Sequence, residues 1–429
     1  MNKRTYQATN VKAVNVDKLG ATLSGRAVLG IDIAKEKQFA AVTSEDRSCV
    51  QIVKWSHPSE TPAFIAMCTE LKARGLKLEA VMEPSGTYGD AIRALLLSAG
   101  VPVFRMAGKR VHDAAEVFDG VPGVHDAKAA VLIGRLHLDN ASEPWPLPTA
   151  SERELDALRQ VLGLHRDRLY AQRGRLEALT ARYWPELTLE LSLESLTLLE
   201  LLARYGGPSK VAADEAGARA LMKRIGGTFL KDEVIEAVLK SSRSTLGVPM
   251  IAAEETLVRA MAVEAMHART AAAAAAKALT KVAKKDIAPA MVAMVGLVTA
   301  ATLIACGVSP TKYGSAGALQ KAMGLNLREF SSGTKKGGVH ISKRGDGMAR
   351  QVLFLAALRL IKTDPVVAAW YRKKVARDGG KKRKAVVAVM RKMAMALWHV
   401  GRGHAFDATK LFDINKLGLP ARPSQEVAQ

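Results

Sequence analysis

Cysteine, acidic residues and long apolar runs are all scarce in this chain of 429 residues. Only three cysteines are present (Cys49, Cys68 and Cys306), and no two of them form a CxxC pair. This scarcity disfavours a disulfide framework or a structural zinc site and suits a reducing cytoplasm. No run reaches the roughly 18 apolar residues that cross a bilayer, and the polar N-terminus lacks the apolar core of a secretory signal. We therefore expect a cytoplasmic protein without a membrane span.

The shortage of acids is uneven along the chain. Lys and Arg number 63 against 41 Asp and Glu, which gives a formal charge of +22. Residues 331–403 alone hold 18 basic residues and three acids, a net charge of +15. A solvated helix face usually interleaves both signs, whereas charge of one sign in one segment is typical of a surface that binds a polyanion. Nucleic acid is therefore the expected partner.

The first third of the chain has the pattern of a layered α/β domain. Residues 1–25 are polar and are expected to form a poorly ordered leader. Short β-rich runs then alternate with helical spacing, which favours an α/β domain over 26–145. The expected strands are 26–34, 38–44, 49–55, 78–84 and 101–106, and the expected helices are 59–75, 87–100 and 125–140.

The rest of the chain reads as helical. Leucines near heptad spacing at 151–184 and an alanine-rich stretch at 250–285 predict two long helices. These helices favour an antiparallel or intersubunit coiled coil within 150–286, with an ordinary helical bundle as the alternative. A compact, mostly helical domain is expected over 287–410, followed by a tail at 411–429. It includes a buried helix at 287–306 and helices at 346–363, 365–378 and 384–402.

Three carboxylates are candidates for a metal site. Asp32 lies inside the first apolar strand, where an acid is costly unless it is paired or bound to metal. Glu83 ends a later strand, and strand ends are where sites of α/β sheets collect. Asp126 opens a helix, and a helix N-cap is its simplest role if it acts alone. Oxygen ligands of this kind suit Mg²⁺ or Mn²⁺ rather than zinc.

The segment 324–347, GLNLREFSSGTKKGGVHISKRGDG, contains a candidate nucleophile. Ser331 and Ser332 precede a glycine and are followed by four cations that suit a phosphate. The simpler interpretation is a basic surface loop with two ordinary serines. A second basic run follows between the last two expected helices. The candidate nucleic-acid contacts are Lys335, Lys336, Lys343, Arg344, Lys381, Lys382, Arg383 and Lys384.

Four motifs in this order resemble one protein family: GIDIAKEK, EPSGTY, HDAKAAVLIGRL and GLNLREFSSG…ISKRG. They look like those of bacterial insertion-sequence transposases that join an RNase H-like (RuvC-like) acidic domain to a C-terminal serine transposase domain. The likeness covers about 26–140 and 287–408. It implies a helical middle, a DNA recombinase activity, and an RNA encoded by the element that guides the enzyme. A homo-oligomer, dimer or tetramer, is the expected assembly.

The resemblance also implies an Asp-Glu-Asp-Asp tetrad that binds metal. Asp32, Glu83 and Asp126 match its first, second and last acids. The third acid usually stands three residues before the last, where this chain has Gly123. Asp119 is the nearest substitute.

The family motif places a nucleophilic serine directly before a glycine, which selects Ser332. A covalent serine–DNA link would conserve the energy of the phosphodiester, so no cofactor beyond metal is expected. The acids and this serine lie far apart in sequence, so they are expected to work together only as a composite site, within one chain or across subunits.

Two other functions remain open from the sequence. In a metal-dependent, junction-resolving nuclease the acids would activate water and the serine would only contact phosphate. In a non-catalytic nucleic-acid scaffold the acids would have decayed, and Gly123 is the residue that favours this alternative.

Overall fold

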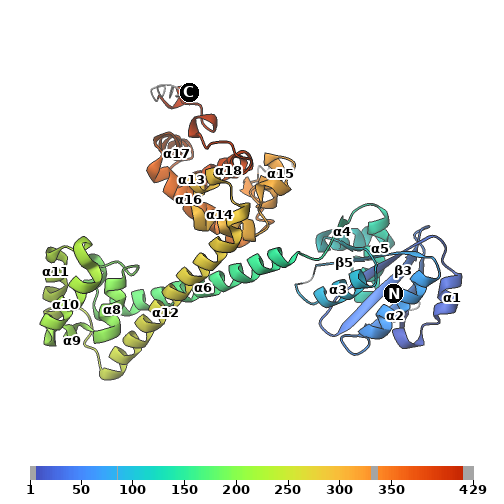
Figure 1. Cartoon of the computed structure of the whole chain (residues 1–429), viewed down its shortest axis with the longest axis horizontal. Coiled ribbons are helices and arrows are strands. Elements are labelled where there is room, and N and C mark those ends of the chain that lie inside the picture. The colour runs from blue at the N-terminus through green and yellow to red at the C-terminus, as the bar shows by residue number, and fades with distance from the viewer. Residues whose placement is uncertain (1–5, 85, 330–336, 419–429) are drawn as a thin grey trace. The chain divides into compact units, whose positions relative to one another are not determined.

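The computed structural model describes residues 6–84, 86–329 and 337–418. The chain divides into two compact units, Met1–Thr149 and Ala150–Gln429. Figure 1 traces both units along the chain. Each is described by itself below.

The N-terminal unit is built on one sheet with the strand order β1-β4-β3-β2-β5-β6-β7. Strands β2, β3 and β4 form the expected antiparallel meander, whereas β5 and β6 continue the sheet parallel to β2. The sequence prediction of a mixed α/β domain is confirmed. The strands are β1 (Ala8–Asn10), β2 (Arg26–Asp32), β3 (Lys37–Ser44), β4 (Cys49–Ser56), β5 (Lys77–Met82), β6 (Val103–Arg105) and β7 (Glu143–Pro144).

Helices cover both faces of this sheet. Leu29 and Ile31 of β2 share a core with α1 (Val16–Ala21), α2 (Thr61–Ala73) and α3 (Asp90–Ser98). Since side chains alternate along a strand, the neighbouring Val28 points to the other face. There it packs against α4 (Gly108–Asp119) and α5 (Asp126–Leu138). Successive residues of β2 therefore pack against different helical layers.

The prediction of a poorly ordered leader is wrong for residues 6–23. Strand β1 pairs in parallel with β4 at the edge of the sheet. Val11, Leu19 and Leu23 are buried in the core on the α2 face. The polar composition hid this segment because its three fully buried apolar side chains are widely spaced along the sequence.

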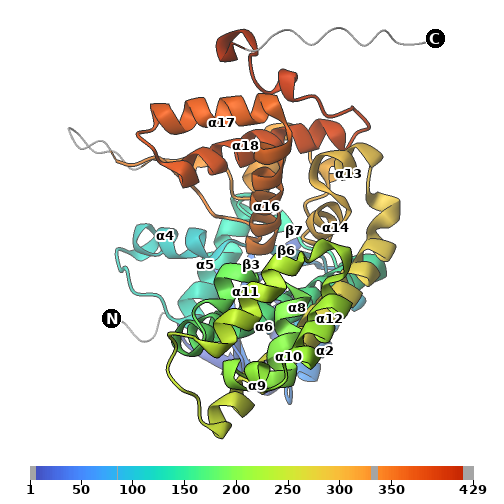
Figure 2. The ribbon, with the colours of Figure 1, turned by 90° about the vertical axis from the view of Figure 1, so that its left-hand side faces the viewer.

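Two long helices organise the second unit. α6 (Ala150–Tyr183) and α12 (Ala252–Ala283) pack along each other, and their close association is visible in Figures 1 and 2. The end of α6 meets the start of α12, where the Tyr183 hydroxyl donates to Glu254 over 2.6 Å. Early residues of α6 instead share a core with late residues of α12. The pair is therefore antiparallel within one chain.

These two helices contribute to two cores. The second half of α6 and the first half of α12 enclose one core with the short helices between them. The other halves join a core with the C-terminal helices. The predicted boundary between helical middle and C-terminal domain near 286 stays a prediction.

The remaining helices are α7 (Leu187–Glu190), α8 (Leu196–Tyr205), α9 (Pro208–Ala213), α10 (Glu215–Gly226), α11 (Asp232–Arg243), α13 (Pro289–Val295), α14 (Leu297–Ala305), α15 (Ala316–Ala322), α16 (Gly347–Thr363), α17 (Pro365–Arg377) and α18 (Lys382–Val400).

The apolar stretch expected as one buried helix at 287–306 is two helices. Gly296 separates α13 from α14 with a φ of 83°, a conformation that favours glycine. Both helices bury side chains in the C-terminal core. Within the described residues, no single helix is long and apolar enough to cross a membrane. The segments Pro289–Val295 and Leu297–Lys312 together have sufficient length and apolar character, but they are bent by 110° relative to each other.

Candidate acidic active site

Two of the predicted acids stand at adjacent strand ends. Asp32 is the last residue of β2, and Glu83 directly follows β5. The two strands are parallel, with Ile31 paired to Met82, so Asp32 and Glu83 continue the same register. Side chains at paired positions project to the same face. Both carboxylates are therefore placed on the α4–α5 side of the sheet, at the carboxyl ends of its strands.

The third acid reaches this place because α5 crosses β2 very closely. A Cβ on Gly30 would lie 2.2 Å from the Ala130 carbonyl oxygen and 2.4 Å from the Gly134 nitrogen. Only two glycines facing each other allow this approach. Asp126 precedes Ala130 by about one helical turn, so the start of α5 is held beside the end of β2. The charge of Asp126 contributes to the raised pKa of Asp32.

The alternative role of Asp126 as a helix cap is wrong. His125 occupies the N-cap position, and its Nδ1 accepts from the Lys128 backbone N–H over 3.3 Å. Asp126 is then the first residue of α5 and is exposed. Its carboxylate does not cap the start of α5, so it is available to the acid site.

Burial and the neighbouring acids make Asp32 costly to ionise. Burial, followed by the charges of Asp126 and Glu83, raises the pKa of Asp32 from 3.8 to about 6. Burial also raises the pKa of Glu83. A cation placed among like charges relieves this repulsion.

Glu83 is seated against the first residue of α4. A Cβ on Gly108 would lie 1.9 Å from Glu83 Oε1 and 2.4 Å from Cδ. The glycine therefore makes the space that the carboxylate fills. The free N–H groups at a helix start favour a negative charge there.

The donor set fits a hard divalent cation, although it is not a preformed cage. Carboxylate oxygens are the ligands that Mg²⁺ and Mn²⁺ take. Across the described ranges, no three Asp, Glu, His or Cys side chains converge closely enough to hold an ion. The three acids are thus neighbours that a cation would have to draw together.

Asp119, the predicted substitute for the third acid, lies in a different set of contacts. Its carboxylate pairs with Lys128 Nζ at 2.7 Å and accepts from the Tyr6 hydroxyl at 2.8 Å. The charge of Asp119 is not among the causes that raise the pKa of Asp32. The structure brings together Asp32, Glu83 and Asp126, and it places Asp119 elsewhere.

The predicted serines lie outside the described residues, as do Lys335 and Lys336. The described segments on either side pair as two short antiparallel strands, β8 (Leu327–Arg328) and β9 (His340–Ile341).

The base of this β8–β9 pair is tightly clamped. The Ser342 backbone N–H donates to the Asn326 carbonyl over 2.8 Å, and that of Lys343 donates to the Gly324 carbonyl over 2.9 Å. A Cβ on Gly345 would lie 2.2 Å from the Ala322 carbonyl oxygen. Gly324 and Gly345 therefore allow the backbone before β8 to approach the backbone after β9 closely.

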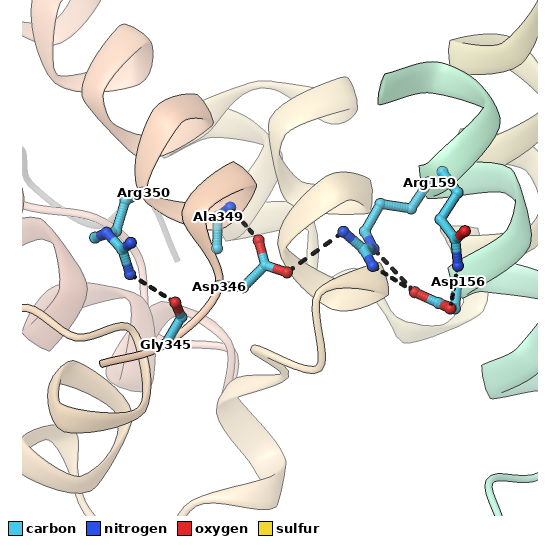
Figure 3. Close-up of polar contacts among 7 residues, drawn as sticks. Asp156, Arg159, Gly345, Asp346, Ala349 and Arg350 are labelled. Carbon is cyan, nitrogen blue, oxygen red and sulfur yellow. Dashed lines mark hydrogen bonds and ion pairs between the residues drawn. The ribbon is translucent and has the colours of Figure 1, made fainter. Parts of the chain in front are cut away.

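A series of hydrogen bonds and ion pairs connects the base of the β8–β9 pair to α6. Asp346 caps α16 by accepting from the Ala349 N–H at 2.9 Å, and its other oxygen meets Arg159 at 3.3 Å. Arg159 also pairs with Asp156, one turn earlier on α6, at 2.6 Å. Figure 3 shows this chain of contacts. The residues between β9 and α16 are thus joined to α6 through Asp346.

The predicted basic contacts that the structure describes are exposed. Lys343 and Arg344 follow β9. Lys381–Lys384 open α18, where no side chain caps the helix. Exposed cations at a helix start suit a phosphate.

Sequence reasoning missed four positions that shape the acid site. Gly30 and Gly134 interrupt an apolar strand and an apolar helix, and such glycines mark close backbone contacts. Lys128 interrupts the apolar run AKAAVLIG, which is the signal for a buried charge with a partner. Gly108 carried no signal, since it stands among polar residues at a helix start.

Comparison with known proteins agrees with this layout. Residues 29–181 match the profile of the DEDD transposases of IS110 elements, described as "Transposase". Residues 292–372 match a second profile, described as "Transposase IS116/IS110/IS902 family". The first match contains the three acids, and the second contains the segment with the predicted serines.

Two curated relatives resemble nearly the whole chain. One is the insertion element IS110 uncharacterized 43.6 kDa protein of Streptomyces coelicolor, 24% identical over 89% of this chain and 96% of its own length. Another is the insertion element IS900 uncharacterized 42 kDa protein of Mycobacterium paratuberculosis, 24% identical over 88% of this chain and 96% of its own. With both profiles in order along one chain, the protein is a transposase of the IS110/IS116/IS902 family, a DNA recombination enzyme.

Proposed function

We propose that this transposase cuts and rejoins DNA at a divalent metal site held by Asp32, Glu83 and Asp126. The observation that carries the proposal is the gathering of three acids from three separate elements beside one another, with the pKa of Asp32 raised to about 6. Such clusters of perturbed carboxylates concentrate at functional sites. The family implies dependence on a divalent metal, and Mg²⁺ or Mn²⁺ fits the oxygen donors.

The fold of the N-terminal unit supports this assignment. An antiparallel meander followed by two parallel strands, with helices on both faces, is the arrangement expected of an RNase H-like domain. The acids stand at the carboxyl ends of its strands, where sites of α/β sheets lie. When bound, the metal would polarise a phosphate and stabilise the charges on the attacking and leaving oxygens. Asp32, Glu83 and Asp126 would hold that metal.

Ser332 is the proposed nucleophile. The match to the second transposase profile spans it, and the described residues on either side of residues 330–336 are joined at the clamped base of the β8–β9 pair. The Ser332 hydroxyl oxygen would attack the scissile phosphorus, the P–O bond to the leaving strand would break, and the serine proton would pass to that leaving oxygen. This leaves a serine–phosphate ester and a free 3′ or 5′ DNA hydroxyl. Attack by a DNA hydroxyl on that ester would restore both the phosphodiester and the serine. Lys343 and Arg344, with Lys335 and Lys336, would balance the phosphate charge.

The nucleic-acid partners follow from the charge. The excess of +15 over 331–403 and the exposed Lys381–Lys384 support binding to DNA backbone. We further propose that an RNA encoded by the element guides the enzyme to its ends and target, and that the enzyme works as a homo-oligomer. Base pairing by an RNA would supply the sequence specificity.

Ser332→Ala tests the covalent step. We expect DNA binding at moderate salt to be unchanged and covalent protein–DNA adducts on element-end DNA to fall below detection, because the nucleophile is gone. Adducts trapped in denaturing gels give the measurement, and Ser331→Ala is the matched control that should retain them. Adducts of normal yield in Ser332→Ala would overturn the assignment. Metal-dependent cleavage by wild type without any adduct would favour a nuclease that activates water.

A further inference from the structure

Lys128 is completely buried on α5, two residues after Asp126. A buried ammonium group is costly unless its donors are satisfied and its charge is balanced. Lys128 Nζ donates to Asp119 Oδ1 over 2.7 Å and to the Val121 carbonyl over 2.6 Å. The lysine therefore ties the segment before α5 to the helix itself.

Asp119 is fully engaged in this arrangement. Besides Lys128, its Oδ1 accepts from the Val121 N–H at 3.0 Å, and its Oδ2 accepts from the Tyr6 hydroxyl at 2.8 Å. The Lys128 ammonium, followed by these hydrogen bonds, lowers the pKa of Asp119. This carboxylate is held as an anion by partners of its own, apart from the three acids.

Tyr6 extends the cluster to the cap of α5. Its ring lies edge-on to His125, with centroids 5.0 Å apart, and His125 caps the helix that Asp126 begins. The N-terminal segment is held at the sheet edge by β1. The segment 119–125 is thus fixed at both ends, by Lys128 and Asp119 at one and by Tyr6 and His125 at the other.

We propose that Lys128 is a positioning residue of the acid site and that Asp119 is its counterion rather than a metal ligand. Through Asp119, Val121 and Tyr6 it fixes the segment that sets the start of α5, and with it Asp126. The chain replaces the expected third acid by Gly123, and Asp119 does not supply it. The inference rests on the proposed metal site, because positioning is defined relative to that site.

A pair of variants separates a counterion from a ligand. If Asp119 is a ligand, Asp119→Asn weakens Mn²⁺ binding by the same factor whether or not Lys128 is present. If it acts through Lys128, the loss disappears in the Lys128→Met background, where no buried charge needs a partner. Lys128→Met alone should weaken Mn²⁺ binding about 10-fold, as expected when a group that orients a ligand is removed.

The measurement is free Mn²⁺ by electron paramagnetic resonance on the full chain, well below the melting temperature of each variant. We expect Asp119→Asn to melt lowest, Asp119→Asn/Lys128→Met to melt higher, and the double variant to bind Mn²⁺ like Lys128→Met. Tyr6→Phe, which keeps the charge pair, should cost only a few-fold in affinity. An equal Asp119→Asn loss in both backgrounds would overturn the inference, as would unchanged Mn²⁺ affinity in Lys128→Met.

Asp113→Asn and Asp126→Asn serve as controls. Asp113 forms an exposed ion pair with Lys109 at 2.6 Å on α4, so its variant should bind Mn²⁺ like wild type. If Asp126→Asn also bound Mn²⁺ like wild type, the proposed metal site itself would fail. The order of melting temperatures would then still report on the Lys128–Asp119 pairing.

Discussion

Asp32→Asn should lose metal-dependent strand cleavage by about 10³-fold or more, because a bound metal contributes several kcal/mol to the transition state of phosphoryl transfer. Asparagine has the same shape, but it lacks the charge that holds a cation. The measurement is cleavage of labelled element-end DNA in Mg²⁺ or Mn²⁺, with DNA binding measured in parallel. We expect binding to stay within a few-fold of wild type. Cleavage within ten-fold of wild type would remove Asp32 from the site.

The same variant should be more stable than wild type without metal. Asp32 has a pKa of about 6 in the folded protein against 3.8 unfolded, so the folded state binds its proton more tightly. Stability from this group is greatest below about pH 4 and falls as the pH rises through 6. For a partly exposed carboxylate we expect a gain of about 1 kcal/mol in Asp32→Asn at pH 8. Calorimetric melting should show the gain shrinking towards pH 4, and a variant less stable than wild type at pH 8 would contradict it.

Gly108→Ala should reduce cleavage by about 10²-fold while leaving the fold intact. The added methyl group would meet the Glu83 carboxylate at 1.9 Å, and the end of that side chain can turn away. A displacement of about 1 Å in a catalytic group is enough for a loss of this size. Alanine is a better helix former than glycine by up to about 1 kcal/mol, so the melting temperature should not fall.

Gly174→Ala is the matched control for that variant. Gly174 lies inside α6, and a Cβ built there has no heavy atom within 4 Å among the described residues. It should show the helix gain in stability and full cleavage. Wild-type cleavage in Gly108→Ala would show that the seat of Glu83 is not important for the reaction.

Much of the N-terminal fold could be predicted because its strands are continuous apolar runs bounded by charged turns. The same pattern identified Asp32 and Glu83, since an acid at the end of such a run stands out. The edge strand β1 could not be found, because a three-residue strand attached by β1–β4 pairing has almost no side-chain pattern.

The contacts that assemble the site depend on tertiary structure. Asp126 was identified by motif, but its place beside Asp32 depends on the crossing at Gly30 and Gly134. Asp119 was chosen by distance along the sequence, which could not reveal that Lys128 already pairs with it. The break at Gly296 depends on a positive φ that an apolar, small-residue run does not announce.

Direct binding of Mn²⁺ to the full chain tests the central claim, that Asp32, Glu83 and Asp126 form one metal site. Titration calorimetry of wild type should show Mn²⁺ binding, and Asp32→Asn, Glu83→Gln and Asp126→Asn should each weaken it at least ten-fold, whereas Asp113→Asn should not. Wild-type affinity in any of the first three variants would contradict the account.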